Sequence, residues 1–252
     1  MTGTLTVVGL GPGNVLQITP EALAAVERAS DFFGYGPYVE RLDLRADQLR
    51  HASDNREEMS RAAQALTLAA TGADVCVVSG GDPGVFAMAA AVCEALEAGP
   101  AEWREVEFSV VPGLTAMLAV AAKAGAPLGH DFCAISLSDN LKPWEIIERR
   151  LIAAAEAGFV MAFYNPVSKA RPHQLDQAFD ILRAHLPDTV PVIFGRAAGR
   201  PDEKIRIEAL ADARADMADM STCIIVGSVE TRLIERPGQR PLVYSPRSWG
   251  KA

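Results

Sequence analysis

The stretch LTVVGLGPG, residues 5–13, decides how the chain begins to fold. Its first half is apolar, which is typical of a strand in a parallel sheet, and the glycines behind it permit a tight turn and close approach of the backbone to a ligand. Residues 19–30, TPEALAAVERAS, predict a helix with Thr19 as N-cap and Pro20 at the first helical position. A strand, a glycine loop and a helix in this order predict the first unit of an α/β sheet.

The same alternation continues along the chain. In the first half we expect further strands at 31–35, 74–81 and 106–113 and helices at 55–72 and 85–99. The second half predicts helices at 114–125, 143–158 and 172–186 and strands at 133–139, 159–166 and 191–198. Closely spaced strand-like runs then follow at 204–210, 221–228 and 241–247.

This pattern predicts an α/β fold with two α/β domains. Residues 1–114 are expected to form a parallel sheet with helices on both faces. Residues 115–252 are expected to form a mixed sheet, because closely spaced strands favour antiparallel pairs. Ligands bind at the carboxyl ends of parallel strands and at domain interfaces, so we expect a ligand cleft between the two sheets.

The composition is that of a globular protein. The chain has 252 residues, of which 49% are hydrophobic and 22% are charged. No apolar run approaches the roughly 20 residues of a membrane helix, and the first residues lead directly into a strand instead of a signal-peptide pattern. We therefore expect a cytoplasmic protein without a membrane partner.

The cysteines give no indication of a metal site or a disulfide framework. There are four, at positions 76, 93, 133 and 223, and none forms a CxxC pair with another. We expect them to be small core residues, and we expect no metal.

Charge is distributed unevenly along the chain. The net charge is −8, with 7 Lys and Arg against 16 Asp and Glu up to Thr115, and 17 against 16 from Ala116 onward. An acidic total disfavours nucleic acid as a partner, because phosphate binding needs a dominant basic face. A small polyanion held by arginines of the second half remains compatible with these numbers.

Two glycine loops are the first candidates for a site. GLGPG, residues 9–13, lacks the GxGxxG spacing of a dinucleotide site and reads either as a ligand loop or as a plain turn. In SGGDPGVF, residues 79–86, Asp82 is either a ligand contact or the N-cap of a helix with Pro83 at its first position. Val85 and Phe86 can wall off one side of a ligand.

Motifs in a fixed order carry a resemblance. GLGPG, SGGDPGVF, VPGLTA, SLSDNLKPWE, YNPVSKAR and IIVGSVETR resemble the class III S-adenosylmethionine-dependent methyltransferases of tetrapyrroles over almost the whole chain. GYGPYVE, SLSDNLKPWE and YNPVSKAR are most similar to the branch that methylates C(17) of a precorrin ring. One departure is Asn14, where many members of the family carry aspartate.

The resemblance implies that S-adenosylmethionine is the cofactor and that a homodimer forms. It assigns cofactor contacts to Pro12, Gly80, Gly81, Asp82, Val85, Thr115, Ala116, Asn165 and Ala197. A substrate with many carboxylates is implied as well. Arg171, Arg196 and Arg232 are the candidates for binding it, because arginine pairs with carboxylates through two hydrogen bonds, although each also reads as a surface charge.

Ring contraction, which that branch couples to methylation, needs a proton acceptor and donors near the substrate. We name Tyr35, His130 and Asp131 as catalytic candidates, while Tyr35 also reads as a packed aromatic and His130 as a turn residue. Ser138, Asp139 and Tyr164 lie in or beside the motifs as well.

Three other functions stay open from sequence alone: another methyltransferase of the same pathway, a nicotinamide-dependent oxidoreductase, and a tetrapyrrole carrier without activity. The loop spacing disfavours the oxidoreductase. The absence of a Cys/His cluster mildly favours a metal-free substrate over one that already holds cobalt.

Overall fold

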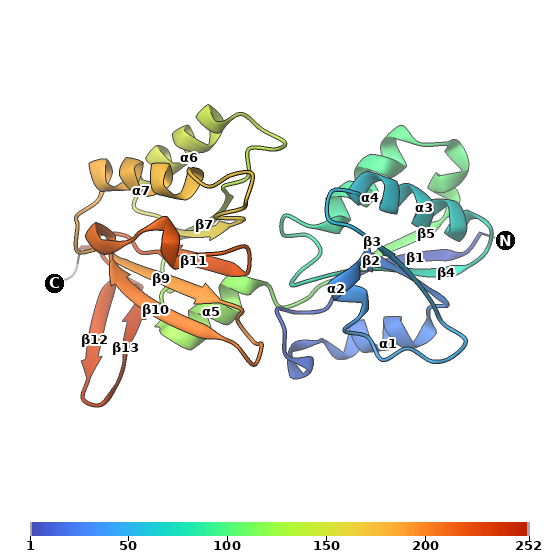
Figure 1. Cartoon of the computed structure of the whole chain (residues 1–252), viewed down its shortest axis with the longest axis horizontal. Coiled ribbons are helices and arrows are strands. Elements are labelled where there is room, and N and C mark those ends of the chain that lie inside the picture. The colour runs from blue at the N-terminus through green and yellow to red at the C-terminus, as the bar shows by residue number, and fades with distance from the viewer. Residues whose placement is uncertain (1, 251–252) are drawn as a thin grey trace. The chain divides into compact units, whose positions relative to one another are not determined.

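The computed structural model describes residues 2–250, and it divides into two compact units between Thr115 and Ala116 (Figure 1). Each unit is an α/β structure, as predicted, and each is described by itself. The predicted domain boundary, after residue 114, stays a prediction, because compactness alone does not show that either part folds on its own.

The first unit contains a five-stranded sheet in the order β3-β2-β4-β1-β5. Every neighbouring pair is parallel, which confirms the parallel sheet expected from the alternation of strands and helices. The strands are β1 (Thr4–Gly9), β2 (Asp31–Tyr35), β3 (Leu49–Ser53), β4 (Asp74–Ser79) and β5 (Glu107–Val111).

Helices cover both faces of this sheet (Figure 1). The helices α1 (Pro20–Arg28) and α2 (Gly36–Val39) lie on one face, and α3 (Glu58–Ala70) and α4 (Met88–Ala98) lie on the other. Alternation along β4 supplies both cores, since Val75 and Val77 pack toward α3 and α4 while Cys76 and Val78 pack toward α1. Short 3-10 helices occupy Val15–Gln17 and Ala101–Glu105.

The predicted ends of two helices are confirmed. The Thr19 hydroxyl accepts a hydrogen bond from the Ala22 N–H at 3.1 Å at the start of α1, with Pro20 next to it. Gly72 follows the end of α3 with a φ of 105°, a conformation that favours glycine. Helix α4 begins at Met88, later than the predicted residue 85.

The second unit is built on a mixed five-stranded sheet in the order β10-β9-β11-β8-β7. Strands β7 and β8 are parallel, and the other pairs are antiparallel, which confirms the predicted mixed sheet. The strands are β7 (Phe132–Ser136), β8 (Val160–Tyr164), β9 (Pro191–Arg196), β10 (Lys204–Ala209) and β11 (Thr222–Val226). A separate three-stranded sheet, β12-β13-β6, joins β12 (Arg232–Arg236), β13 (Gln239–Tyr244) and β6 (Gly125–Ala126).

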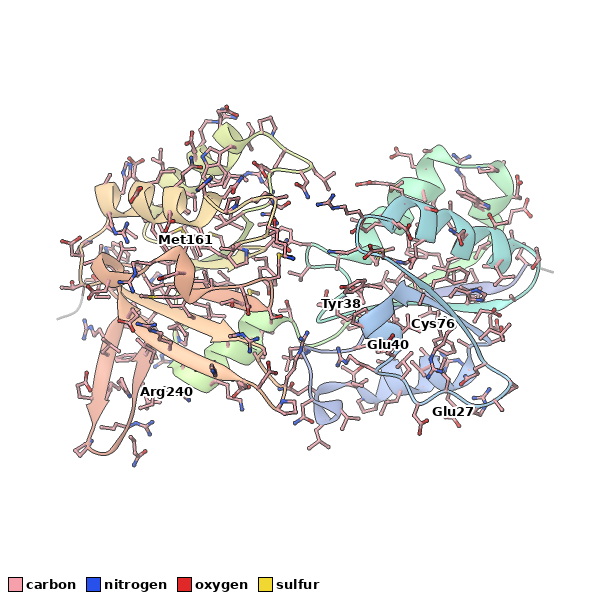
Figure 2. The ribbon with its side chains drawn as sticks, in the orientation of Figure 1. Glu27, Tyr38, Glu40, Cys76, Met161 and Arg240 are labelled. Carbon is pink, nitrogen blue, oxygen red and sulfur yellow. The ribbon has the colours of Figure 1, made fainter. Side chains whose placement is uncertain are left out.

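Helices α6 (Trp144–Glu156) and α7 (Gln174–His185) form the main core of this unit with one face of the sheet. Phe163, Phe179 and Phe194 are almost fully buried there. Helix α5 (Ala116–Ala124) packs against β9 and β11, and 3-10 helices occupy Leu210–Asp212 and Ala215–Met217. In Figure 2, Cys76 marks the interior of the first unit and Met161 that of the second, and neither side chain is exposed.

The sequence did not predict β3, β12, β6 or α2. Both β3 and β12 are edge strands whose residues are mostly exposed, so they lack the apolar alternation that identifies a strand. Within residues 2–250, the structure has no helix that is both long and apolar enough to cross a membrane.

Candidate functional site

Three loops meet at the carboxyl edge of the first sheet. Gly9, at the end of β1, lies opposite Ser79 of β4, and Val8 lies opposite Val111 of β5. Because the strands are parallel, the segments 10–13, 80–86 and 112–115 all leave from this edge. They contain the predicted cofactor residues Pro12, Gly80, Gly81, Asp82, Val85 and Thr115.

The loops are joined by backbone atoms. The Gly11 N–H donates to the Gly81 carbonyl at 3.1 Å, and the Gly81 N–H donates to the Gly11 carbonyl at 3.0 Å. A Cβ on Gly9 would lie 2.7 Å from both the Gly113 Cα and the Gly81 carbonyl oxygen, which is closer than any side chain can approach. Glycine is therefore required here by the contact of one loop with another, whether or not a ligand binds.

Asp82 connects two of these loops. Its Oδ1 accepts from the Gly84 N–H at 2.8 Å, and its Oδ2 accepts from the Gly113 N–H at 3.0 Å. Since α4 begins only at Met88 and Ala87 is its N-cap, Asp82 is not a helix cap. That alternative from the sequence is wrong, because the chain makes a further loop between Pro83 and the helix.

The same loop contains an aromatic residue whose backbone conformation is strained. Phe86 has a φ of 51° and is 51% exposed, while Val85 beside it is half-buried. An aromatic residue in the left-handed region is rare and is found where the surrounding structure imposes it. Thr115, at the end of this edge, is buried.

Aromatic residues from the segment after β2 support these loops. Tyr35, at the carboxyl end of β2, makes an edge-to-face contact with Tyr38, with ring centroids 5.4 Å apart. Gly80 packs on the Tyr38 ring, since a Cβ on Gly80 would lie 2.6 Å from the Tyr38 Cζ. The predicted catalytic candidate Tyr35 is thus brought to the same edge as the glycine loops.

A second set of loops lies at one edge of the mixed sheet in the second unit. Ser136 of β7 is opposite Tyr164 of β8, and β11 runs antiparallel between β8 and β9. The carboxyl ends of β7, β8 and β9 therefore share one edge. Asn165 and Ala197 follow β8 and β9 there, with φ values of 51° and 50°.

Side chains connect these loops to one another. The Asn165 side-chain amide donates to the Ser136 hydroxyl at 3.0 Å. The Arg171 guanidinium donates to the Asn165 carbonyl at 3.0 Å and, at 3.5 Å, to the Leu137 carbonyl. The Tyr164 hydroxyl accepts from the Met117 N–H at 3.1 Å, which ties the first turn of α5 and its first residue, Ala116, to the end of β8.

Two units with glycine-rich and polar loops at their strand ends match the architecture expected of a ligand-binding α/β protein. The sequence of residues 4–214 matches the family of tetrapyrrole (corrin/porphyrin) methylases. The chain belongs to this family. The resemblance found in the sequence is thereby confirmed, and this tetrapyrrole methylase is an S-adenosylmethionine-dependent methyltransferase.

Individual relatives of the methylase agree with this. The chain is 68% identical over 252 residues to a precorrin-3B C(17)-methyltransferase of Sinorhizobium sp, covering 100% of this chain and 99% of that protein. It is 38% identical over 246 residues to a probable cobalt-factor III C(17)-methyltransferase of Salmonella typhimurium, covering 97% and 99%. The crystal structure of the methyltransferase CobJ has a TM-score of 0.93 and 52% identity, covering 97% of this chain and 100% of that one.

The arginines predicted to bind substrate are engaged with protein groups in this methylase. Arg171 is buried, and its side chain is used on the carbonyls described above. Arg196 forms ion pairs of 2.7 Å with both Asp202 and Asp219, and Arg232 lies 3.7 Å from Glu230. The hydrogen bond from Arg196 lowers the pKa of Asp202 below its ordinary value. The role of these arginines toward a substrate stays a prediction.

His130 and Asp131 lie at the other end of the second unit's sheet. They precede β7, and the Asp131 carbonyl accepts from the N–H of Val160, the first residue of β8. They are thus at the amino ends of these strands, whereas Asn165 and Ala197 follow carboxyl ends. The His130 ring contacts Trp249, at a centroid distance of 5.9 Å. The structure does not bring the two residues together with the other predicted positions of this unit.

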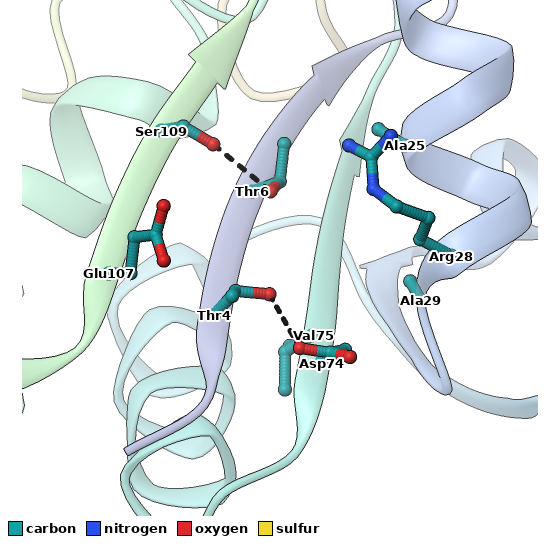
Figure 3. Close-up of a pocket in the computed structure, with 9 residues that line it drawn as sticks. All are labelled: Thr4, Thr6, Ala25, Arg28, Ala29, Asp74, Val75, Glu107 and Ser109. Atoms are coloured by element: carbon teal, nitrogen blue, oxygen red, sulfur yellow. Dashed lines mark hydrogen bonds between the residues drawn. The ribbon is translucent and has the colours of Figure 1, made fainter. Parts of the chain in front are cut away.

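A polar hollow of ≈ 270 Å³ lies on the α1 face of the first sheet (Figure 3). Thr4, Asp74 and Glu107, the first residues of their strands, line it together with Arg28. The Thr4 hydroxyl donates to the Asp74 carboxylate at 2.9 Å. The hollow is therefore at the amino ends of the strands, away from the glycine loops. Within residues 2–250, no cluster of three His, Cys, Asp or Glu side chains is arranged to hold a metal ion.

Sequence reasoning missed Arg41, whose guanidinium donates to carbonyls of the first glycine loop. It directly follows the GYGPYVE motif. The motif was used for the resemblance, but nothing in its residue types shows where the next side chain points.

Proposed function

We propose that the methylase transfers a methyl group from S-adenosylmethionine to C(17) of precorrin-3B, with ring contraction to precorrin-4, in cobalamin biosynthesis. The observation that carries this proposal is the identity of 68% over the full length to a precorrin-3B C(17)-methyltransferase. Motifs of the same branch lie at the loops described above, which supports the assignment.

The first unit suits the cofactor. S-adenosylmethionine supplies an electrophilic methyl group on a cationic sulfonium, so the protein has only to bind and orient it. The first unit has 16 Asp and Glu against 7 Lys and Arg up to Thr115, which favours a cationic ligand. Its loops present glycine backbone and contain no Lys or Arg of their own, and we assign them the contacts through Pro12, Gly80, Gly81, Asp82, Val85 and Thr115. Ala116, Asn165 and Ala197 complete the proposed set.

The second unit suits a polyanionic macrocycle. In the 137–143 loop, partial burial lowers the pKa of Lys142, and the charges of Arg150 and Arg171 lower it further. Asp139 in the same loop opposes these effects, but the pKa is lowered on balance, so a bound anion would reduce the repulsion among the three cations. We propose that Lys142 contacts the substrate's carboxylates. Arg196 and Arg232 would do so by exchanging their present carboxylate partners, and Arg171 acts through the Asn165 loop.

Tyr35 is our proposed proton-transfer residue for ring contraction, because it lies at the edge where the glycine loops meet. His130 and Asp131 remain candidates, but they need a substrate that reaches the amino end of β7. Replacing Tyr35 by Phe should leave methyl transfer intact while ring contraction fails. An unchanged yield of contracted product would exclude Tyr35 from that step.

The function is tested by incubating the purified protein with S-adenosylmethionine and precorrin-3B and identifying the product by mass spectrometry and carbon NMR. We expect one added methyl at C(17) and a contracted ring. A methyl group at another carbon would identify a different methyltransferase of the pathway, and no transfer together with substrate binding would indicate a carrier.

One specific observation supports a second substrate. The Salmonella typhimurium relative, 38% identical, is named for the cobalt-containing cobalt-factor III. We favour the metal-free substrate because the relative named for it is far more similar. Offering both substrates in one competition assay decides between them, since the preferred one is consumed first.

We also propose that the protein works in the cytoplasm as a homodimer. The exposed Leu233 and Ile234 of the edge strand β12 offer apolar surface for such an association. Light scattering of the protein as it elutes from a size-exclusion column should give twice the mass of one chain. A monomer at micromolar concentration would refute the dimer. Cell fractionation tests the location.

A further inference from the structure

The segment that follows β2 touches both glycine loops of the first unit. Tyr38 lies under Gly80 of the second loop, as described above. Arg41, which follows α2, reaches the first loop. In Figure 2, Tyr38 of α2 and Glu40 directly after it mark this segment. The segment GYGPYVER, residues 34–41, therefore lies against both glycine loops, which indicates a structural role for it.

The Arg41 guanidinium donates to three backbone carbonyls of the first loop. Its Nη2 donates to the Leu10 carbonyl at 2.7 Å and to the Gly13 carbonyl at 3.4 Å, and its Nη1 donates to the Gly11 carbonyl at 3.1 Å. The Gly11 carbonyl also accepts from the Gly81 N–H. One planar guanidinium thus fixes several peptide groups at once, which a single ammonium cannot do.

This loop needs such a partner. Residues 9–13 include Gly9, Gly11 and Gly13, and glycine has more conformational freedom to lose than any other residue. A loop that becomes ordered only when its ligand arrives loses affinity by the cost of that ordering. If the loop is already held in its binding conformation, this cost has been met during folding.

We propose that Arg41 is a positioning residue, which holds the 10–13 loop in the conformation that binds the cofactor. The inference rests on the proposed function, because it takes S-adenosylmethionine and its product S-adenosylhomocysteine as the ligands of this loop. Arg41 acts through the loop, and the inference assigns it no contact with the reacting atoms.

The test is calorimetric titration of Arg41→Met with S-adenosylhomocysteine, which requires no methyl acceptor. Methionine keeps an unbranched stem and removes the donors. We expect the Kd to rise about tenfold or more, because ordering of the loop then accompanies binding. In the methyl-transfer assay the KM for S-adenosylmethionine should rise while kcat at saturating cofactor stays near that of the wild type.

Arg50→Met is the matched control. The Arg50 side chain donates to the Leu42 carbonyl at 2.6 Å in the same unit, so this variant also removes one charge and a hydrogen bond to a backbone carbonyl. It should leave the Kd within about twofold, since none of the glycine loops is touched. Hydrogen exchange provides a readout that a general loss of stability does not produce: in Arg41→Met the peptide spanning 9–18 should exchange faster while β4 and β5 do not.

Two further measurements apply if Arg41→Met does not fold. Arg41→Lys keeps the charge but replaces the planar guanidinium, which donates through two nitrogens, with a single ammonium. It should bind S-adenosylhomocysteine several-fold more weakly. Millimolar guanidinium should restore part of the affinity of Arg41→Ala, whose short side chain leaves space for the cation, but leave Arg50→Met unchanged. Equal binding by the wild type and Arg41→Lys, or by the wild type and a folded Arg41→Met, would overturn the inference. A wild type that does not bind S-adenosylhomocysteine would instead refute the proposed function.

Discussion

In the first unit, the loops at the carboxyl edge of the sheet touch one another chiefly through backbone atoms, with the Asp82 carboxylate as a further link, whereas in the second unit side chains make the connections described above. Gly11 and Gly81 exchange hydrogen bonds directly, and Gly9 and Gly113 leave no room for a Cβ. Asn165, Ser136 and Arg171 carry the corresponding connections in the second unit. A backbone contact tolerates no added atom, while a side-chain contact can be weakened in steps.

The largest effect is expected at Gly113. A Cβ there would clash with the Gly81 carbonyl oxygen and lie 2.9 Å from the Gly9 Cα, and backbone cannot move aside as a side chain can. We expect Gly113→Ala to lower the free energy of unfolding by about 3 kcal/mol in a urea titration. Gly36→Ala is the control, because a Cβ on Gly36 meets nothing within 4 Å. Equal stability of both variants would show that the loops are not interlocked.

The next effect is expected at Arg171 in the second unit. Replacing this buried side chain with methionine leaves the Asn165 carbonyl without its donor, and we expect a loss of about 2 kcal/mol. Arg149→Met, at an exposed position of α6, should change stability by less than about 0.5 kcal/mol. Should the two variants be alike in chemical denaturation, the side-chain network contributes no stability.

The variant Asp82→Asn tests a carboxylate that joins two loops of the first unit. Asn at this position keeps one acceptor and turns an N–H group toward the other backbone donor, so we expect a loss of about 1 kcal/mol together with weaker binding of S-adenosylhomocysteine. Asp74→Asn is the control, since Asp74 accepts from the Thr4 hydroxyl at the opposite end of the sheet. A variant with unchanged affinity would make Asp82 purely a structural residue.

The smallest effect compares one buried thiol from each unit. Burial raises the pKa of Cys76 and of Cys223 from 9.0 to about 12. The unfolded thiols therefore ionise first as the pH rises, so the free energy of unfolding is unaffected well below pH 9, has fallen by about 0.4 kcal/mol per thiol at pH 9, and falls further as the pH approaches the pKa of the folded state. Urea titrations between pH 8 and 10 give the free energy of unfolding at each pH. In Cys76→Ala and in Cys223→Ala this free energy should fall less steeply with pH than in the wild type. A slope equal to that of the wild type would contradict the buried, protonated thiol.

The sequence predicted the fold well where burial imposes a pattern. The strands that became β1 and β4 are buried apolar runs followed by glycine, and Thr19 with Pro20 indicated the start of α1. The edge strand β5 is mostly exposed, and it was predicted because its residues are nevertheless apolar at several positions. It failed at β3 and β12, whose exposed residues carry no apolar alternation. The start of α4 was also misplaced, because an Asp-Pro pair before an apolar run, such as Asp82-Pro83, is typical of a helix start. In the structure Asp82 instead accepts a hydrogen bond from the Gly113 N–H, which the sequence could not show.

For the site, residue type and position in the chain were enough to find the loops but not the contacts within them. The glycine loops and Tyr35 lie at one edge of the first sheet, because they are at or just after the ends of parallel strands. Arg41 and the burial of Arg171 could not be predicted, because a long flexible side chain reaches several partners and the sequence does not say which. The position of His130 could have been anticipated from its place before a strand instead of after one.

The order of strands in the first sheet has a consequence for synthesis of the chain. Thr4 of β1 pairs with Asp74 of β4 and with Glu107 of β5, so β1 has no neighbouring strand until β4, 70 residues later in the chain, has been made. At roughly 5–20 residues per second, translation leaves this apolar strand waiting for several seconds. Strands β2 and β3 are close in sequence and can pair much earlier. The first glycine loop is thus made well before Gly81 and Gly113, the residues that it contacts.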